Sequence, residues 1–422
     1  MVGFVSGLQA VAVESPSVLR RAGMWLLVLV VVAAPLLHLR VINRVLPSSH
    51  NDLISRWAGV RATLNGQDPY SPTVTQQIEE IADNDPAEPF TYPATLVPLL
   101  APFVRLPWPA FRLLFLLVLV PSLALAVWLS MQMLRLHMSR ADTVAVMLIC
   151  LSTWPVVWGF RMQQLTMLVA VLLVLAWYLL SREQWVAAGI VLALATVKPQ
   201  LVVLLLLWLS VWACLQRRWS FLAALVMTEM AMLAAADILV PGWFPHWLAA
   251  LRGYEGSYGV LPLQMVLGNW IGLLFTVLLC SAAGLRLWKM RNCTPASEEF
   301  GEAIALLLAL TVCTAQAIWL KVYNQTLLVP ACLLLLLGRA DQSARLAVSV
   351  AVVTRVCIVG TLAAVPVAVL GETIGGPAGI WMHLPMLNQY LGPVAVGGLV
   401  LRRAAREKKP HFASTVQMEQ CT

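Results

Sequence analysis

Three polar turns interrupt an otherwise apolar sequence, and each combines a cation with a side-chain amide. They lie at residues 159–164, 198–200 and 321–325. Arginine and lysine bind phosphate by charge and hydrogen bonds together, so turns of this composition predict a site for an anionic phosphate. The alternative is that each cation reaches to a membrane interface as an anchor. The residues concerned are the cations Arg161, Lys198 and Lys321 and the amides Gln164, Gln200 and Asn324.

A carboxylate, Asp52, opens a further polar stretch at residues 51–70. Apolar residues at 53, 57, 60 and 64 form one stripe of a helix that could lie on a membrane surface, ending at Gly66. Asp52 could cap this helix, or it could serve as a general base near the membrane; both hold if Asn51 is the cap. His50 is a second candidate base, with a loop histidine as its simpler interpretation.

Aromatic residues mark two turns that follow this helix. Tyr70 stands in Asp-Pro-Tyr at 68–70, and Tyr92 stands in Phe-Thr-Tyr-Pro at 90–93. In a carbohydrate site such rings could stack on sugar faces, whereas packing on the outer surface is the simpler role. Both tyrosines are candidate substrate-binding residues.

The composition indicates a polytopic membrane protein. Of the 422 residues, 60% are hydrophobic and 11% charged, and the mean hydropathy is +0.82, whereas soluble domains carry about 25% charge. The net charge of +8 does not predict a nucleic-acid partner, because the basic residues flank apolar segments.

Apolar stretches long enough to cross a bilayer recur along the chain. They predict an all-α bundle of about twelve transmembrane helices, forming one domain over 1–402 with a basic tail at 403–422. The expected spans lie near 22–39, 109–134, 141–158, 165–181, 185–197, 201–215, 219–240, 266–288, 302–320, 326–338, 345–370 and 389–401.

Residues 185–215 could form one long helix or a hairpin. Proline at 199 favours a break after Lys198. The hairpin also places most downstream basic flanks in the cytoplasm, as the positive-inside rule requires. Both termini are then cytoplasmic, and the loops at 40–108, 241–265 and 371–388 face outward. The segments 185–197 and 326–338 are short for a bilayer, so Lys198 and Lys321 should lie below the outer surface.

The sequence gives no sign of a metal, a cofactor or a disulfide framework. Its eight cysteines show no CxxC spacing and no Cys/His metal pattern, and none falls in an expected outer loop. No cluster of carboxylates or histidines calls for a metal. We expect neither metal nor cofactor.

Several stretches resemble glycosyltransferase family 87, membrane enzymes of the GT-C class that include bacterial polyprenyl-phosphate-mannose-dependent α-mannosyltransferases. The resemblance spans roughly residues 45–220 and rests on order and spacing. Departures are Tyr-Pro-Ala at 92–94 where the family often has Tyr-Pro-Pro, and Gln-Gln at 163–164 where it often has Gly-Gln. The similar features are an acid after the first span, ATLNGQDPYSP, FTYPATLVPLLAPFVRLP, the stretch 161–208 and the following RRW.

The resemblance implies a GT-C bundle in a bacterial plasma membrane, with an extracytoplasmic active site and Asp52 as catalytic base. The enzyme would move a sugar, mannose above all, from a polyprenyl-phosphate donor to a hydroxyl of a glycolipid or glycan. A secondary transporter is the alternative, since transporters also use broken helices and intramembrane charge. A non-catalytic protein of envelope assembly is a third possibility.

Overall fold

The computed structural model describes residue 29 and residues 51–82, 89–135, 139–255, 264, 267–315 and 322–337. Within these residues the chain is helical and contains no β-strand, which confirms the all-α prediction. The helices are α2 (Leu53–Leu64), α3 (Pro72–Ile81), α4 (Leu96–Leu100), α5 (Trp108–Met133), α6 (Arg140–Leu151), α7 (Trp154–Arg161), α8 (Thr166–Ser181), α9 (Trp185–Leu194), η1 (Ala195–Val197), η2 (Pro199–Leu201), α10 (Val203–Leu215), α11 (Trp219–Leu239), α12 (Trp243–Glu255), α14 (Asn269–Lys289), α15 (Glu298–Ala315), η3 (Val322–Leu328) and α16 (Val329–Leu337).

Three of the described helices, α5, α11 and α14, are long and apolar enough to cross a membrane. A fourth span results if α6 and α7 are counted together, while α8, α9–η1 and α10 are shorter apolar helices. Apart from residue 29, the expected span 22–39 lies outside the described residues, as do the spans 345–370 and 389–401 and the tail 403–422. The topology of twelve spans therefore remains a prediction.

The span expected at 141–158 is not one straight helix. Helix α6 ends at Leu151 and α7 begins at Trp154, with their axes bent by 61°. Pro155 stands in the first turn of α7. Proline has no amide hydrogen and restricts the residue before it, so it begins a helix well and interrupts one badly.

The predicted hairpin at 185–215 is confirmed. The helix breaks at Lys198 between η1 and η2. Trp185 at the start of α9 lies 6.2 Å, ring to ring, from Trp212 near the end of α10, so the two helices run in opposite directions. Helix α9 packs closely against α11, because Gly189 has no side chain and a Cβ there would lie 2.5 Å from the Phe221 carbonyl oxygen.

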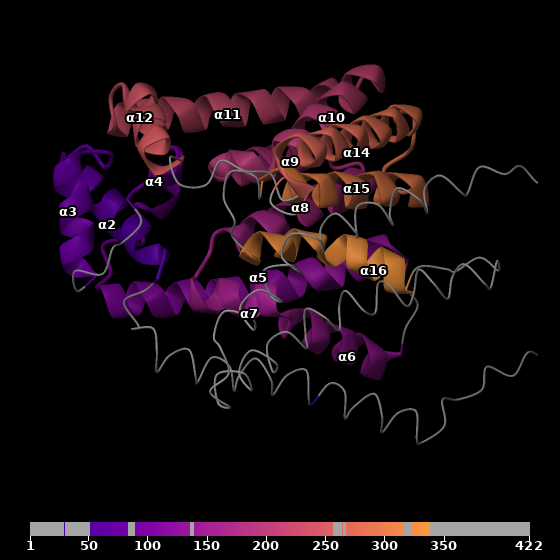
Figure 1. Ribbon diagram of the computed structural model, residues 1–422, viewed down its shortest axis with the longest axis horizontal. Coiled ribbons are helices and arrows are strands. Elements are labelled where there is room, and N and C mark those ends of the chain that lie inside the picture. The colour runs from indigo at the N-terminus through magenta and orange to yellow at the C-terminus, as the bar shows by residue number, and fades with distance from the viewer. Residues whose placement is uncertain are drawn as a thin grey trace, which may run out of the picture.

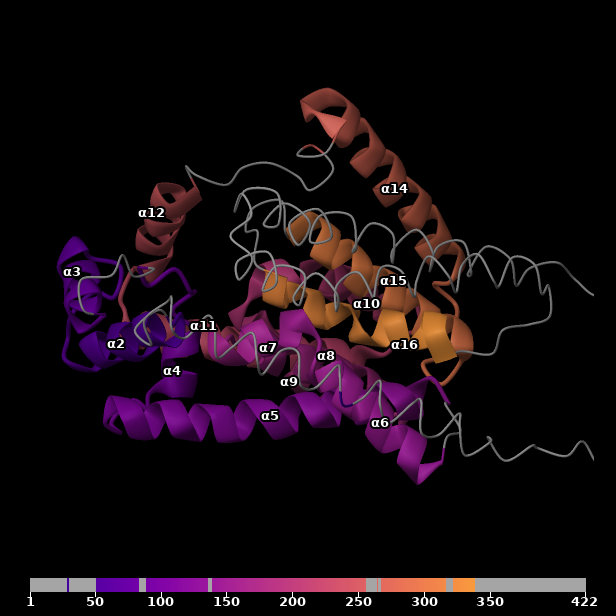
Figure 2. The same ribbon diagram turned by 60° about the horizontal axis from the view of Figure 1, so that its bottom comes forward.

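Four shorter helices, α2, α3, α4 and α12, gather at one end of the bundle in both views (Figure 1, Figure 2). The sequence predicted a helix with one apolar face for α2, and this prediction is wrong. Every residue from 53 to 63 except Arg61 is buried. The predicted end of the helix is confirmed, since Gly66 has a φ of +78° and donates its N–H to Thr63.

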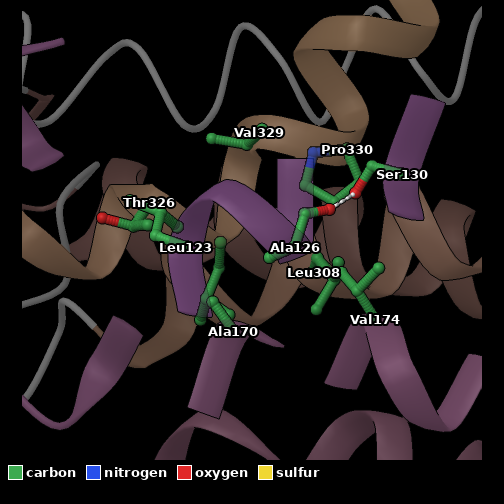
Figure 3. Close-up of a pocket in the computed structure, with 10 residues that line it drawn as sticks. Leu123, Ala126, Ser130, Ala170, Val174, Leu308, Thr326, Val329 and Pro330 are labelled. Carbon is green, nitrogen blue, oxygen red and sulfur yellow. Dashed lines mark hydrogen bonds between the residues drawn. The ribbon is translucent and has the colours of Figure 1, made fainter. Parts of the chain in front are cut away.

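The middle of the bundle is closely packed. Helix α8 packs against α5, α9 and η3, and α16 packs against α5 and α15. The small cavity in Figure 3 has a volume of about 10 Å³ and lies between α5, α8, α15, η3 and α16. It holds one water molecule at most, so this cavity has no room for a substrate.

Candidate active site

Asp52 directs its carboxylate into the protein and does not cap α2. Asn51 caps the helix instead, because its Oδ1 accepts the Leu53 N–H at 2.8 Å. The Asp52 side chain, 7% exposed, accepts hydrogen bonds at Oδ2 from Gln164 Nε2 and, at 3.4 Å, from the Tyr323 hydroxyl. Asn51 thus provides the cap, and the Asp52 carboxylate contacts Gln164 and Tyr323 instead.

The turn between α7 and α8 holds the start of α2 in place. Gln163 adopts a φ of +49°, a conformation that is uncommon for residues other than glycine. Its Oε1 accepts the Asn51 amide at 2.6 Å, and its Nε2 donates to the Arg112 carbonyl of α5 at 2.9 Å. Asn51 also donates to the Arg161 carbonyl at 3.3 Å. This turn therefore fixes the position of Asp52 relative to α5 and α7.

Gln164, which is fully buried, joins the carboxylate to two cations. Its amide nitrogen donates to Asp52, while its Oε1 accepts from Lys198 Nζ at 3.3 Å and from Arg56 Nη2 at 3.4 Å. A carboxylate and two cations thus meet on one side-chain amide. Two of the three polar turns of the sequence, at 159–164 and 198–200, thus come together through Gln164 and Lys198.

Lys198 is buried at the break between η1 and η2, with 5% of its surface exposed. Its Nζ donates to the Thr166 hydroxyl at 2.7 Å and lies 4.9 Å from the centre of the Tyr323 ring and 5.9 Å from that of Tyr92. A buried cation is costly without hydrogen bonds or aromatic faces around it. Both are present, so the position of this charge is well defined.

Arg56 is a functional candidate that the sequence interpretation missed. It is 1% exposed, donates to the Tyr92 hydroxyl at 2.8 Å, and places its guanidinium 4.4 Å from the centre of that ring. The signal that could have found it is its spacing, because residues four apart on a helix share a face and Arg56 follows Asp52 by four. Tyr92 thus contacts a cation of the cluster.

Asn324 and Tyr70 contact residues that in turn contact the two cations. Asn324 Oδ1 accepts the Thr166 hydroxyl at 3.0 Å, and Thr166 in turn binds Lys198. The Tyr70 hydroxyl donates to the Tyr92 carbonyl at 2.7 Å. Burial, followed by the nearby Asp68 carboxylate, raises the pKa of Tyr70, which keeps its hydroxyl protonated as a donor.

The remaining candidates from the sequence are Arg161, Gln200, His50 and Lys321. The Arg161 side chain is half-buried, lies 5.2 Å from the Trp158 ring centre, and contacts the Met162 sulfur at 3.5 Å; its backbone carbonyl is what accepts Asn51. Gln200 is half-buried on η2. His50 and Lys321 lie outside the described residues.

The cluster can supply a proton acceptor and positive charge at one place. Asp52 is the acceptor, and Lys198 and Arg56 provide the charge next to it. Such a pairing suits a reaction in which a hydroxyl loses a proton while an anionic leaving group departs. Among the described residues, no three His, Cys, Asp or Glu side chains come together as a metal site would require.

Comparison with known families gives one match. The family model described as Glycosyltransferase family 87 matches residues 90–316, which is more than half of the chain. Searches among curated proteins and among solved structures gave no match. The matched region contains the Gln163–Gln164 turn, Lys198 and α12, while Asp52 and Arg56 precede it.

Proposed function

Since the chain belongs to glycosyltransferase family 87, we propose that it transfers a sugar, mannose above all, from a polyprenyl-phosphate donor to a hydroxyl of a glycolipid or glycan. The observation that carries this proposal is the Gln164 amide, which joins the Asp52 carboxylate to Lys198 and Arg56. A base and two cations are what a single displacement at a sugar phosphate needs.

Asp52 is the proposed general base. As the acceptor oxygen forms its bond to the anomeric carbon, its proton passes to Asp52, and the bond between that carbon and the phosphate oxygen breaks. General base catalysis contributes typically about 10²- to 10⁴-fold. One displacement inverts the anomeric configuration, so a β-linked donor gives an α-linked product.

Lys198 and Arg56 are the proposed partners of the leaving lipid phosphate. Negative charge grows on the phosphate oxygens as the bond breaks, and cations held in place beforehand stabilise that charge. Their burial supports this role, because water competes weakly for a charge that is already removed from solvent. Arg161 and Lys321 remain candidate phosphate ligands, and Gln200, Tyr70, Tyr92, His50 and Asn324 remain candidate substrate ligands.

The site is proposed to open on the extracytoplasmic side of a bacterial plasma membrane. The end of the bundle opposite Lys198 carries Arg182, Arg217 and Arg218 in the connections between helices. Basic connections are retained on the cytoplasmic side. The lipid tail of the donor would stay in the bilayer while its head reaches the cluster above the short helices α8, α9 and α10.

The deciding experiment measures transfer of labelled mannose from synthetic polyprenyl-phosphate-mannose to extracted membrane glycolipids by the purified protein. Wild type is compared with Asp52→Asn, which keeps the shape of the side chain, and with Asp142→Asn as a matched control at the exposed start of α6. We expect Asp52→Asn to lower kcat by about 10³-fold and Asp142→Asn to leave it unchanged. Equal activity of wild type and Asp52→Asn would refute the proposed base.

A further inference from the structure

Helix α12 contacts two segments next to the cluster, although it lies far from them in the sequence. Its entry is fixed at Gly242, which has a φ of +65° and donates its N–H to Asp237 at 3.1 Å. The helix then contacts the segment at 89–93 and the turn at 68–70, both of which precede it by more than 150 residues. Figures 1 and 2 show α12 at the same end of the bundle as α2, α3 and α4.

Two side chains of α12 make these contacts. The Trp247 indole N–H donates to the Thr91 carbonyl at 2.9 Å. His246 Nδ1 lies 2.8 Å from Asp68 Oδ2, and the other Asp68 oxygen accepts the Tyr70 N–H at 3.0 Å. One contact thus holds the backbone next to Tyr92, and the other holds the turn that carries Tyr70.

Each residue of the segment 90–92 contacts another part of the chain. The Phe90 ring lies 5.5 Å from the Tyr70 ring and packs onto Gly59 of α2, where a Cβ would lie 2.5 Å from it. Thr91 is bound by α12, and the Tyr92 carbonyl accepts the Tyr70 hydroxyl. These contacts set the Tyr92 ring, whose centre is 4.4 Å from the Arg56 guanidinium and 5.9 Å from Lys198 Nζ.

We propose that His246 and Trp247 are positioning residues for the transfer reaction: they clamp residues 68–70 and 90–92 so that Tyr92 faces both cations of the cluster. The inference rests on the proposed function for its effect on transfer, and on the contacts alone for its effect on structure. Neither side chain touches Asp52, Arg56 or Lys198 through any of the contacts above, so their influence passes through Tyr92.

The test uses Trp247→Phe, which keeps an aromatic ring and removes the indole N–H. Trp270→Phe is the matched control, because Trp270 begins α14 and is 84% exposed. His246→Gln keeps a hydrogen-bond donor toward Asp68, whereas His246→Leu removes it. Each purified protein is measured for kcat and donor KM, and for amide hydrogen exchange in the peptide covering 89–95.

We expect Trp247→Phe to speed exchange in 89–95 and to lower kcat/KM for the donor by about tenfold. His246→Leu should show the same pair of changes more weakly, His246→Gln should restore most of the loss, and Trp270→Phe should match wild type. Unchanged exchange and unchanged kcat/KM in Trp247→Phe would overturn the clamp. If wild type transfers no sugar, the proposed function fails, and the exchange measurements decide the clamp on their own.

Discussion

Cations contact aromatic rings at both ends of the bundle, but their burial differs. At the end with Asp52, Arg56 lies 4.4 Å from the Tyr92 ring centre and Lys198 lies 4.9 Å from that of Tyr323, and both are almost fully buried. At the other end, Arg218 lies 4.2 Å from the Trp185 ring centre and Arg182 lies 5.3 Å from that of Tyr178. Arg218 is half-buried and Arg182 is exposed.

The difference in burial indicates that a cation over an aromatic ring has a different role at each end of the bundle. An exposed arginine over a ring loses little hydration, so its charge suits the fixing of topology at a membrane boundary. A buried cation has lost its hydration and needs anionic or polar partners. It therefore attracts an anion that enters the site more strongly than an exposed cation does. This difference is why we propose the buried pair, and not the exposed one, as the phosphate ligands.

The largest effect on this comparison is expected from Lys198→Met, which keeps the length of the side chain and removes its charge. Without the cation, the leaving phosphate loses preorganised stabilisation, and we expect kcat to fall about 10²-fold. Removing one charge from a buried group of charges leaves the others less compensated, so Tm in detergent is measured beside kcat, and we expect kcat to fall by more than any loss of folded protein explains. Arg182→Met at the exposed end is the matched control. A drop in Tm that accounts for the lost activity would remove Lys198 from the phosphate site.

A smaller effect is expected from Gln164→Leu. The substitution removes the amide that orients Asp52 and both cations without changing any of the three charges. Loss of one such hydrogen-bonding group corresponds to about tenfold in kcat. Gln164→Glu is the sharper companion, because it places a second carboxylate beside Asp52 and should reduce kcat further than Gln164→Leu. Steady-state rates for the three proteins give the order, and a Glu variant faster than the Leu variant would contradict it.

Much of the helical framework could be predicted because local physics decides it. The break at Lys198 follows from proline at 199, and the end of α2 follows from Gly66. The break between α6 and α7 has the same cause in Pro155, but the sequence was interpreted as one span because its apolar run continues through the break. The burial of α2 on nearly all sides within the protein could not be predicted correctly, since a stripe of apolar residues does not reveal how many neighbours a helix has.

The candidate site was predictable in its residue types and only partly in its arrangement. Lys198 and Gln164 meet because α8 and α9 are antiparallel neighbours, so the turn before α8 and the break after α9 lie at one end. The contact of Asp52 with Gln164 joins segments far apart in sequence, and no local pattern specifies it. Arg56 was overlooked because it lies within a helix that was expected to face lipid on one side and solvent on the other.

The smallest effect is expected from Arg218→Ala at the far end of the bundle. A partly exposed cation–π contact is worth about 0.5–1 kcal/mol, so Tm should fall slightly while kcat and donor KM stay within about twofold of wild type. The neighbouring Arg217→Ala, which is exposed, serves as the control for general loss of charge. Because Arg218 contacts Trp185 and lies a full helix length from Lys198, a loss of transfer as large as that of Lys198→Met would show that burial does not separate the catalytic cations from the structural ones. The two pairs differ in burial because Arg56 and Lys198 lie among Tyr92, Gln164 and Tyr323, whereas Arg182 and Arg218 lie in short connections between helices.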